Sequence, residues 1–238
     1  RFHFETACRF ALAGADMRAK LDGAPVAWNA AYVAEPGAVL EVGAAENGVY
    51  GYLMPGSGVT TEPELGGRGF HRIAGLGRPI EGGDRLPIGP SPETQPMKLL
   101  PSPAPSGPVR VIPGPQTALF NDDLKARFEA TVFTRSAKAN RQGVRLEQEG
   151  APFTSGAQLQ QVSDFISEGD VQMTGDGTPY VLLADCQTMG GYPRIGTVIP
   201  GDLTRIAQAQ PGDHVRFAFV TVEDATTLWQ SDEAVLKG

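Results

Sequence analysis

A short polar loop between two apolar runs carries the side chains best suited to chemistry. The ten residues from 185 to 194 include five polar or charged side chains: Asp185, Gln187, Thr188, Tyr192 and Arg194. Gly190 and Gly191 lie in the same loop and allow positive φ or a close approach of the backbone to a ligand. The flanking runs, 180–184 and 195–199, have the length and β-branched content of buried strands. We therefore expect a strand, a loop that holds the candidate site, and a second strand.

A second polar cluster, at 140–146, contains Asn140, Arg141 and Arg145. The guanidinium groups of Arg141, Arg145 and Arg194 are suited to bind a carboxylate or phosphate through paired hydrogen bonds. Asp185 could orient one of these arginines or accept a proton. An Arg–Asp pair that only stabilises the loops explains the same residues, and the sequence leaves both interpretations open.

Other catalytic chemistry has no clear candidate in the sequence. His3, His71 and His214 are scattered, and none has a Cys, His or carboxylate neighbour at metal-ligand spacing, so we expect no metal site. No Gly-x-Ser-x-Gly or Cys–His arrangement indicates a nucleophile. Cys186 is expected to be a small buried side chain.

Composition indicates a β-rich globular protein. The chain has 238 residues with 30 Gly and 20 Pro, which favour many turns. A net charge of −7 and the lack of a basic stripe argue against a nucleic-acid partner. The two cysteines predict a reducing, cytoplasmic setting, and no apolar run is long enough to span a membrane. The first residue is Arg1, so we expect that the natural N-terminus lies further upstream.

The pattern of apolar residues predicts two β-rich halves with a few short helices. The N-terminal half covers 1–90, a Pro-rich linker covers 91–108, a barrel half covers 109–222, and a C-terminal helix covers 223–238. In the first half we expect Gly14 to end a strand and 15–21 to form a short helical turn. In the second half a helix capped by Asn121 or Asp122 is expected to plug a barrel end. A further helix is expected at 202–208, and a closing strand at 214–222.

Four blocks in the second half resemble a known family in their order and spacing. They are Val109-Arg110-Val111-Ile112-Pro113-Gly114-Pro115-Gln116, Asn140-Arg141-Gln142-Gly143-Val144-Arg145-Leu146, Gly175-Asp176-Gly177-Thr178-Pro179, and the segment from Leu182 to Ile195. The family is that of the 5-oxoprolinase C subunit, also called allophanate hydrolase subunit 2 or biotin-dependent carboxyltransferase-related, and it includes the kinase-inhibitor antagonist of sporulating bacteria. The resemblance extends over nearly the whole chain.

The resemblance implies a mainly β fold with cyclophilin-like β-barrel architecture. It also implies a component of a multi-subunit enzyme, which works with a kinase-inhibitor-like B subunit and with an A subunit to open 5-oxoproline to glutamate. ATP is the expected cofactor at the level of the complex. One alternative is a carboxyltransferase component that moves a carboxyl group from carboxybiotin to urea or a related amide. A second alternative is a non-catalytic regulatory binder of the B subunit.

The resemblance, together with the polar clusters, defines the expected site. The catalytic candidates are Asn140, Arg141, Asp185, Gln187, Tyr192 and Arg194. The substrate-binding candidates are Arg145, Thr188, Gly190 and Gly191. Two positions depart from the family pattern, since Arg194 stands where Lys is common and Cys186 where Arg is common. Family members begin with a further segment containing an Asp-x-Gly-Arg-x-Gly motif, which we expect to complete the site together with a second protein of the complex.

Overall fold

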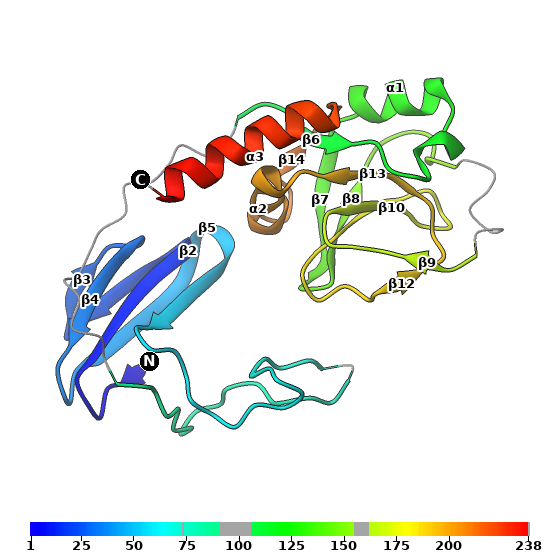
Figure 1. Cartoon of the computed structure of the whole chain (residues 1–238). Helices are drawn as coiled ribbons and strands as arrows, with labels where there is room; N and C mark the ends of the chain where they lie inside the picture. The colour runs from blue at the N-terminus through cyan, green and yellow to red at the C-terminus, as the bar shows by residue number, and fades with distance from the viewer. Residues whose placement is uncertain (73, 91–105, 155–161, 238) are drawn as a thin grey trace. The chain divides into compact units, whose positions relative to one another are not determined.

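The computed structural model describes residues 1–72, 74–90, 106–154 and 162–237 (Figure 1). The chain divides into two compact units, Arg1–Ser102 and Pro103–Gly238. Most of the predicted linker, residues 91–105, lies outside the described residues, so its boundaries stay predictions. The mainly β fold class is confirmed, since both units are built on sheets whose strand pairs are mostly antiparallel.

The first unit is a five-stranded antiparallel sheet around two long strands, β2 and β5. Its strands are β1 (Phe2–His3), β2 (Cys8–Leu21), β3 (Ala24–Val26), β4 (Ala30–Ala34) and β5 (Val39–Pro55). The predicted helical turn at 15–21 is wrong, because β2 continues through Gly14 to Leu21. Gly14 adopts φ +87°, and the register against β5 shifts immediately after it. Pairing with the long strand β5, although irregular, thus overrides the local tendency of residues 15–21 to form a helical turn.

The second unit contains an eight-stranded sheet that curls toward closure. Its order is β14-β7-β8-β11-β10-β13-β6-β15, and only β6 and β15 run parallel. The strands are β6 (Val109–Ile112), β7 (Phe133–Asn140), β8 (Gly143–Glu147), β10 (Asp170–Met173), β11 (Pro179–Leu182), β13 (Arg194–Val198), β14 (His214–Val215) and β15 (Phe217–Phe219). The edge strands β14 and β15 are separated only by Arg216, so the sheet curls into a nearly closed barrel. The single closing strand expected at 214–222 is therefore two strands, one for each edge.

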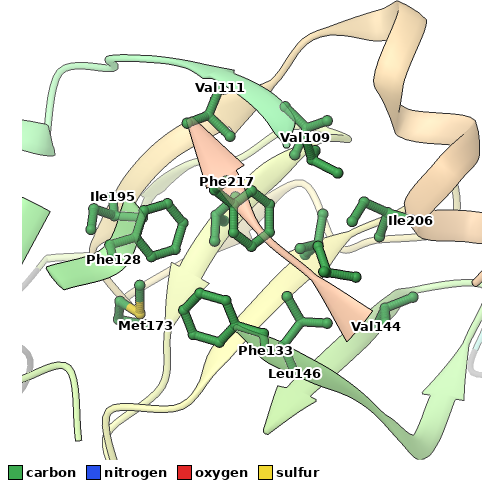
Figure 2. Close-up of a cluster of buried hydrophobic side chains, with 14 of the residues drawn as sticks. Val109, Val111, Phe128, Phe133, Val144, Leu146, Met173, Ile195, Ile206 and Phe217 are labelled. Carbon is green, nitrogen blue, oxygen red and sulfur yellow. The ribbon is translucent and has the colours of Figure 1, made fainter. Parts of the chain in front are cut away.

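A dense apolar core fills the barrel (Figure 2). Along β10 and β11, Val171, Met173 and Val181 are fully buried, as expected where alternate side chains point inward. The helix α1 (Asp122–Ala130) is capped by Asn121, whose Oδ1 accepts from the Leu124 amide at 2.8 Å. It inserts Phe128, whose ring stacks on Phe217 with centroids 4.7 Å apart. This is the predicted helix, and its aromatic side chain forms part of the barrel core.

The remaining elements cover or extend the barrel. They are η1 (Thr117–Leu119), α2 (Pro200–Gln208), α3 (Val222–Lys237) and a two-stranded ribbon of β9 (Asp164–Phe165) with β12 (Met189–Gly190). The helix expected at 202–208 is α2, and its buried Ile206 belongs to the core. The ribbon matters most for the site, because β12 lies inside the predicted loop 185–194.

Candidate functional site

The barrel brings the two predicted polar clusters together. The segment 140–146 forms the β7–β8 hairpin, and β8 pairs with β11, which leads into the loop at 185. Beyond β11 the contact continues, since the Asp185 amide donates to the Arg141 carbonyl at 2.9 Å. The two apolar runs are β11 and β13, as predicted, but they are not neighbours in the sheet, because β10 lies between them.

Arg141 and Asp185 form an ion pair at the end of this hairpin. Nε and Nη2 of Arg141 lie 2.7 and 2.6 Å from Oδ2 of Asp185. The Arg141 side chain is 53% exposed and the Asp185 side chain 31%. Asn140 shapes the turn beside them, since its Oδ1 accepts from the Gln142 amide at 2.8 Å. The pair thus lies at the surface, where the turn of the β7–β8 hairpin meets the loop after β11.

Arg145 and Arg194 are held by other residues of the chain. Nη2 of Arg145 lies 3.3 Å from both Asp176 Oδ2 and Thr178 Oγ1. The Thr174 hydroxyl, followed by Thr178 and Arg145, lowers the pKa of Asp176 to about 2. Asp176 therefore stays charged near neutral pH. Its carboxylate holds the Arg145 side chain against the turn at 174–178.

The Arg194 side chain is only 13% exposed and contacts three other segments. Its guanidinium donates to Gln116 Oε1 at 3.2 Å, to the Phe165 carbonyl at 2.5 Å, to Asp170 Oδ2 at 3.2 Å and to Asp164 Oδ2 at 2.5 Å. Sequence reasoning found Arg194 but missed these acceptors, which are separated from it by 24 to 78 residues.

The remaining predicted residues lie on or beside the β9–β12 ribbon. Gln187 and Thr188 are exposed, and the Thr188 carbonyl accepts from the Ile166 amide at 3.1 Å. Tyr192 is 44% exposed, while Gly190 and Gly191 are partly buried. The ribbon therefore presents polar groups on a surface strip, next to exposed apolar side chains of Phe165 and Met189.

A row of polar side chains crosses the outer face of the barrel beneath the loop. The register pairs Arg145 with Tyr180, Tyr180 with Gln172, and Gln172 with Arg194. Each alternates along its strand with core residues, so all four belong to the face that points away from the core. Two members of this row, Tyr180 and Gln172, are absent from the predicted site. Period-two alternation could have marked them as outward-facing, but not as neighbours of the arginines.

Gln172 is the unusual member of the row. The residue is 3% exposed, and its Nε2 has no hydrogen-bond partner among the described residues. A Cβ added at Gly190 would lie 2.8 Å from that nitrogen, so the glycine of the predicted loop packs directly over the amide. A buried amide donor without an acceptor is rare and destabilising. The Nε2 group of Gln172 is therefore suited to donate a hydrogen bond to the carbonyl oxygen of a ligand.

Cys186 has the properties of an unreactive thiol. Burial raises the pKa of the Cys186 thiol, and the carboxylates of Glu168, Asp170 and Asp185 act in the same direction. The thiolate, which is the nucleophilic form, is thus disfavoured. Over the described ranges, His, Cys, Asp and Glu nowhere gather in a group of three that could hold a metal ion. In the same part of the chain, every helix is too short or too polar to cross a membrane.

Comparisons with known proteins match the chain over nearly all its length. The family model for the carboxyltransferase domain, subdomain A and B, matches residues 1–219. The C subunit of 5-oxoprolinase from Escherichia coli K12 is 32% identical over 97% of this chain and 75% of that protein. The C subunit of the Haemophilus influenzae 5-oxoprolinase is 28% identical over 98% of this chain and 76% of that protein.

A solved structure shows the same fold within a much larger protein. The crystal structure of the K. lactis urea amidolyase aligns with 98% of this chain at a TM-score of 0.81 and 23% identity. This chain spans only 16% of that protein's length. At this identity the likeness establishes the fold.

Proposed function

Because the chain belongs to the family of the carboxyltransferase domain, subdomain A and B, we propose that it is the C subunit of a 5-oxoprolinase-type amidohydrolase. In this proposal it acts in a complex with homologues of the A and B subunits. The complex opens the lactam of 5-oxoproline to glutamate, adding one water across the C–N bond, and uses ATP. The similarity to two 5-oxoprolinase C subunits over at least 97% of the chain supports this proposal.

The single structural observation that carries the proposal is the Gln172 amide nitrogen beneath the loop, which has no hydrogen-bond partner among the described residues. A cyclic amide presents a carbonyl oxygen, and that acceptor would satisfy the Nε2 donor. Gly190 lies over this nitrogen, and glycine gives the loop the backbone freedom that access to the amide requires.

Arg141 supplies the second contact in the proposed site. Its half-exposed guanidinium is suited to the carboxylate of 5-oxoproline, with Asp185 fixing its orientation. Gln187, Thr188 and Tyr192 line the surface strip beside the ribbon and are proposed to contact the substrate. We assign ATP to the complex, with no ATP-binding residue of this chain named.

Reconstitution tests the proposal directly. The chain is combined with homologues of the A and B subunits, and glutamate and ADP are measured with 5-oxoproline and ATP as substrates. We expect activity only when this chain is present, and a strong loss with Arg141→Ala. Lys125→Ala, which removes a surface ion pair to Asp122, is the control and should retain full activity. Full activity without this chain would reject the proposal.

A second candidate function is favoured by the family description itself. A carboxyltransferase domain would move a carboxyl group from carboxybiotin to urea or a related amide. The same Gln172 donor would bind the urea carbonyl. The test supplies biotin carboxylase, a biotinylated carrier, ATP and labelled bicarbonate, and follows label into urea. Label transfer that depends on this chain, without 5-oxoproline hydrolysis, would favour this alternative.

A further inference from the structure

We infer that Arg194 is a positioning residue, which anchors the β9–β12 ribbon through Asp164, Gln116 and Asp170 and does not bind the substrate. This inference rests on the proposed function for its kinetic consequences. It assigns a shared role to three residues that lie outside the site expected from the sequence. It also changes the role expected for Arg194, from a clamp on a carboxylate to an internal support.

The guanidinium of Arg194 has no nitrogen left without an acceptor. Nε contacts Gln116, Nη1 contacts the Phe165 carbonyl and Asp170, and Nη2 contacts Asp164. The side chain is 13% exposed, against 53% for Arg141. A substrate carboxylate would have to displace two carboxylates already paired with Arg194, which opposes a role of Arg194 as the anion contact.

Two of the acceptors, Gln116 and Asp164, also bind each other, and the third, Asp170, is held by further hydrogen bonds. Gln116 Oε1 accepts from the Arg194 backbone amide at 3.0 Å, and Gln116 Nε2 donates to Asp164 Oδ2 at 3.3 Å. Asp170 is 4% exposed and accepts from Thr197 Oγ1 at 2.6 Å and from the Ser167 amide at 2.9 Å. These bonds hold the guanidinium from several sides, in a network that is buried at Asp170 and partly exposed at Asp164.

The ribbon needs such support. β9 and β12 share only two residue pairs, Met189 with Phe165 and Gly190 with Asp164, and a two-stranded ribbon this short is unstable alone. Arg194 binds both residues of β9, through the Asp164 side chain and the Phe165 carbonyl. β9 in turn places β12, which follows Thr188 directly and holds Gly190 over Gln172. Anchoring β9 therefore fixes the loop that faces the proposed substrate.

The test uses mutations of the acceptors as well as of the arginine. Arg194→Ala, Asp164→Asn, Gln116→Leu and the double variant Arg194→Ala/Asp164→Asn are compared in the reconstituted complex. We expect each single variant to lower kcat about 10-fold with KM for 5-oxoproline changed less than about twofold. The double variant should be no worse than Arg194→Ala, because residues of one unit are not additive. Arg194→Lys should restore part of the lost kcat.

A second readout does not depend on activity. Hydrogen exchange of the Ile166 and Gly190 amides in the free chain should be at least about 10-fold faster in Asp164→Asn, while the Val171 amide in the core strand stays unchanged. Lys125→Ala is the control. Asp164→Asn and Gln116→Leu keep the test decisive if Arg194→Ala does not fold.

Three results would overturn the inference. The first is a KM increase of about 100-fold confined to Arg194→Ala, which is expected of a substrate contact. The second is unchanged exchange in the ribbon, and the third is an unchanged kcat despite a loosened ribbon. If the wild-type complex has no 5-oxoprolinase activity, the proposed function fails, and the exchange measurement still decides whether Arg194 anchors the ribbon.

Discussion

Arg141 and Asp185 are 44 residues apart in the sequence and form a direct ion pair, with Nη2 2.6 Å from Oδ2. The contact joins the β7–β8 hairpin to the loop after β11, which are the two polar clusters predicted from the sequence. Because both side chains remain partly exposed, the pair is expected to contribute little to folding.

Loss of this ion pair should affect activity far more than stability. In the proposed function, we expect Arg141→Ala to lower kcat/KM of the reconstituted complex about 100-fold, because the proposed charge-assisted contact to the substrate carboxylate would be lost. The free energy of unfolding of the chain should fall by less than about 1 kcal/mol. Steady-state kinetics and urea unfolding measure the two effects. A large loss of stability with normal activity in folded protein would show that the pair is only structural.

Replacement of Gln172 should separate function from stability in the same way. Gln172→Leu removes a buried amide donor that has no partner among the described residues, so we expect stability to be unchanged or raised by about 1 kcal/mol. In the proposed function, kcat/KM for 5-oxoproline should fall about 10-fold because one hydrogen bond is lost. Gln148→Leu is a control, since the buried Oε1 of Gln148 also has no partner in the described part of the chain but lies beyond the other end of β8. Equal activity in both variants would contradict the assignment.

The turn before β11 should not accept a side chain. Gly177 has φ +72°, and an added Cβ would lie 2.7 Å from the Phe153 backbone nitrogen. We expect Gly177→Ala to reduce the free energy of unfolding by roughly 3 kcal/mol, from left-handed strain and steric overlap together. Gly150→Ala is the control, because Gly150 has φ +92° but open space around it. It should cost about 1 kcal/mol. Thermal and denaturant unfolding provide the comparison.

The buried carboxylate of Asp202 should make the second unit sensitive to acid. Burial alone would raise the pKa of Asp202, but hydrogen bonds from the Arg110 side chain and backbone outweigh it and lower the pKa below 3.8. A pKa lowered by folding adds stability above the unfolded value of 3.8, and that stability is lost as pH falls through the folded value.

Unfolding measured at decreasing pH below 4 should therefore show falling stability in the wild type. We expect a shallower decline in Asp202→Asn, which starts from a lower stability at neutral pH because Arg110 loses its charged partner. Asp123→Asn, on the exposed face of α1, should follow the wild type. Identical slopes for Asp202→Asn and the wild type would contradict the stabilising role of the pair.

Local sequence patterns predicted much of the fold. The buried strands beside the loop and the Asn121 cap of α1 follow from short-range alternation and capping, which are properties of a few neighbouring residues. The error at 15–21 has the opposite cause, since pairing with β5 decides the conformation there. The division of 214–222 into two strands depends on closure of the barrel, which no local pattern records.

The sequence by itself determined the family, the β-rich class and the loops in which polar side chains gather, because these depend on residue order and local propensity. Only the tertiary structure decided what the polar side chains do. Arg141 and Arg194 look equivalent in the sequence, yet one stands at the surface beside Asp185 and the other is bound by three segments. Gln172 joins the polar row with Arg194 only through its neighbours in the sheet. The physical reason is that strand register places distant residues on one face, so the role of a side chain depends on partners far away in the sequence.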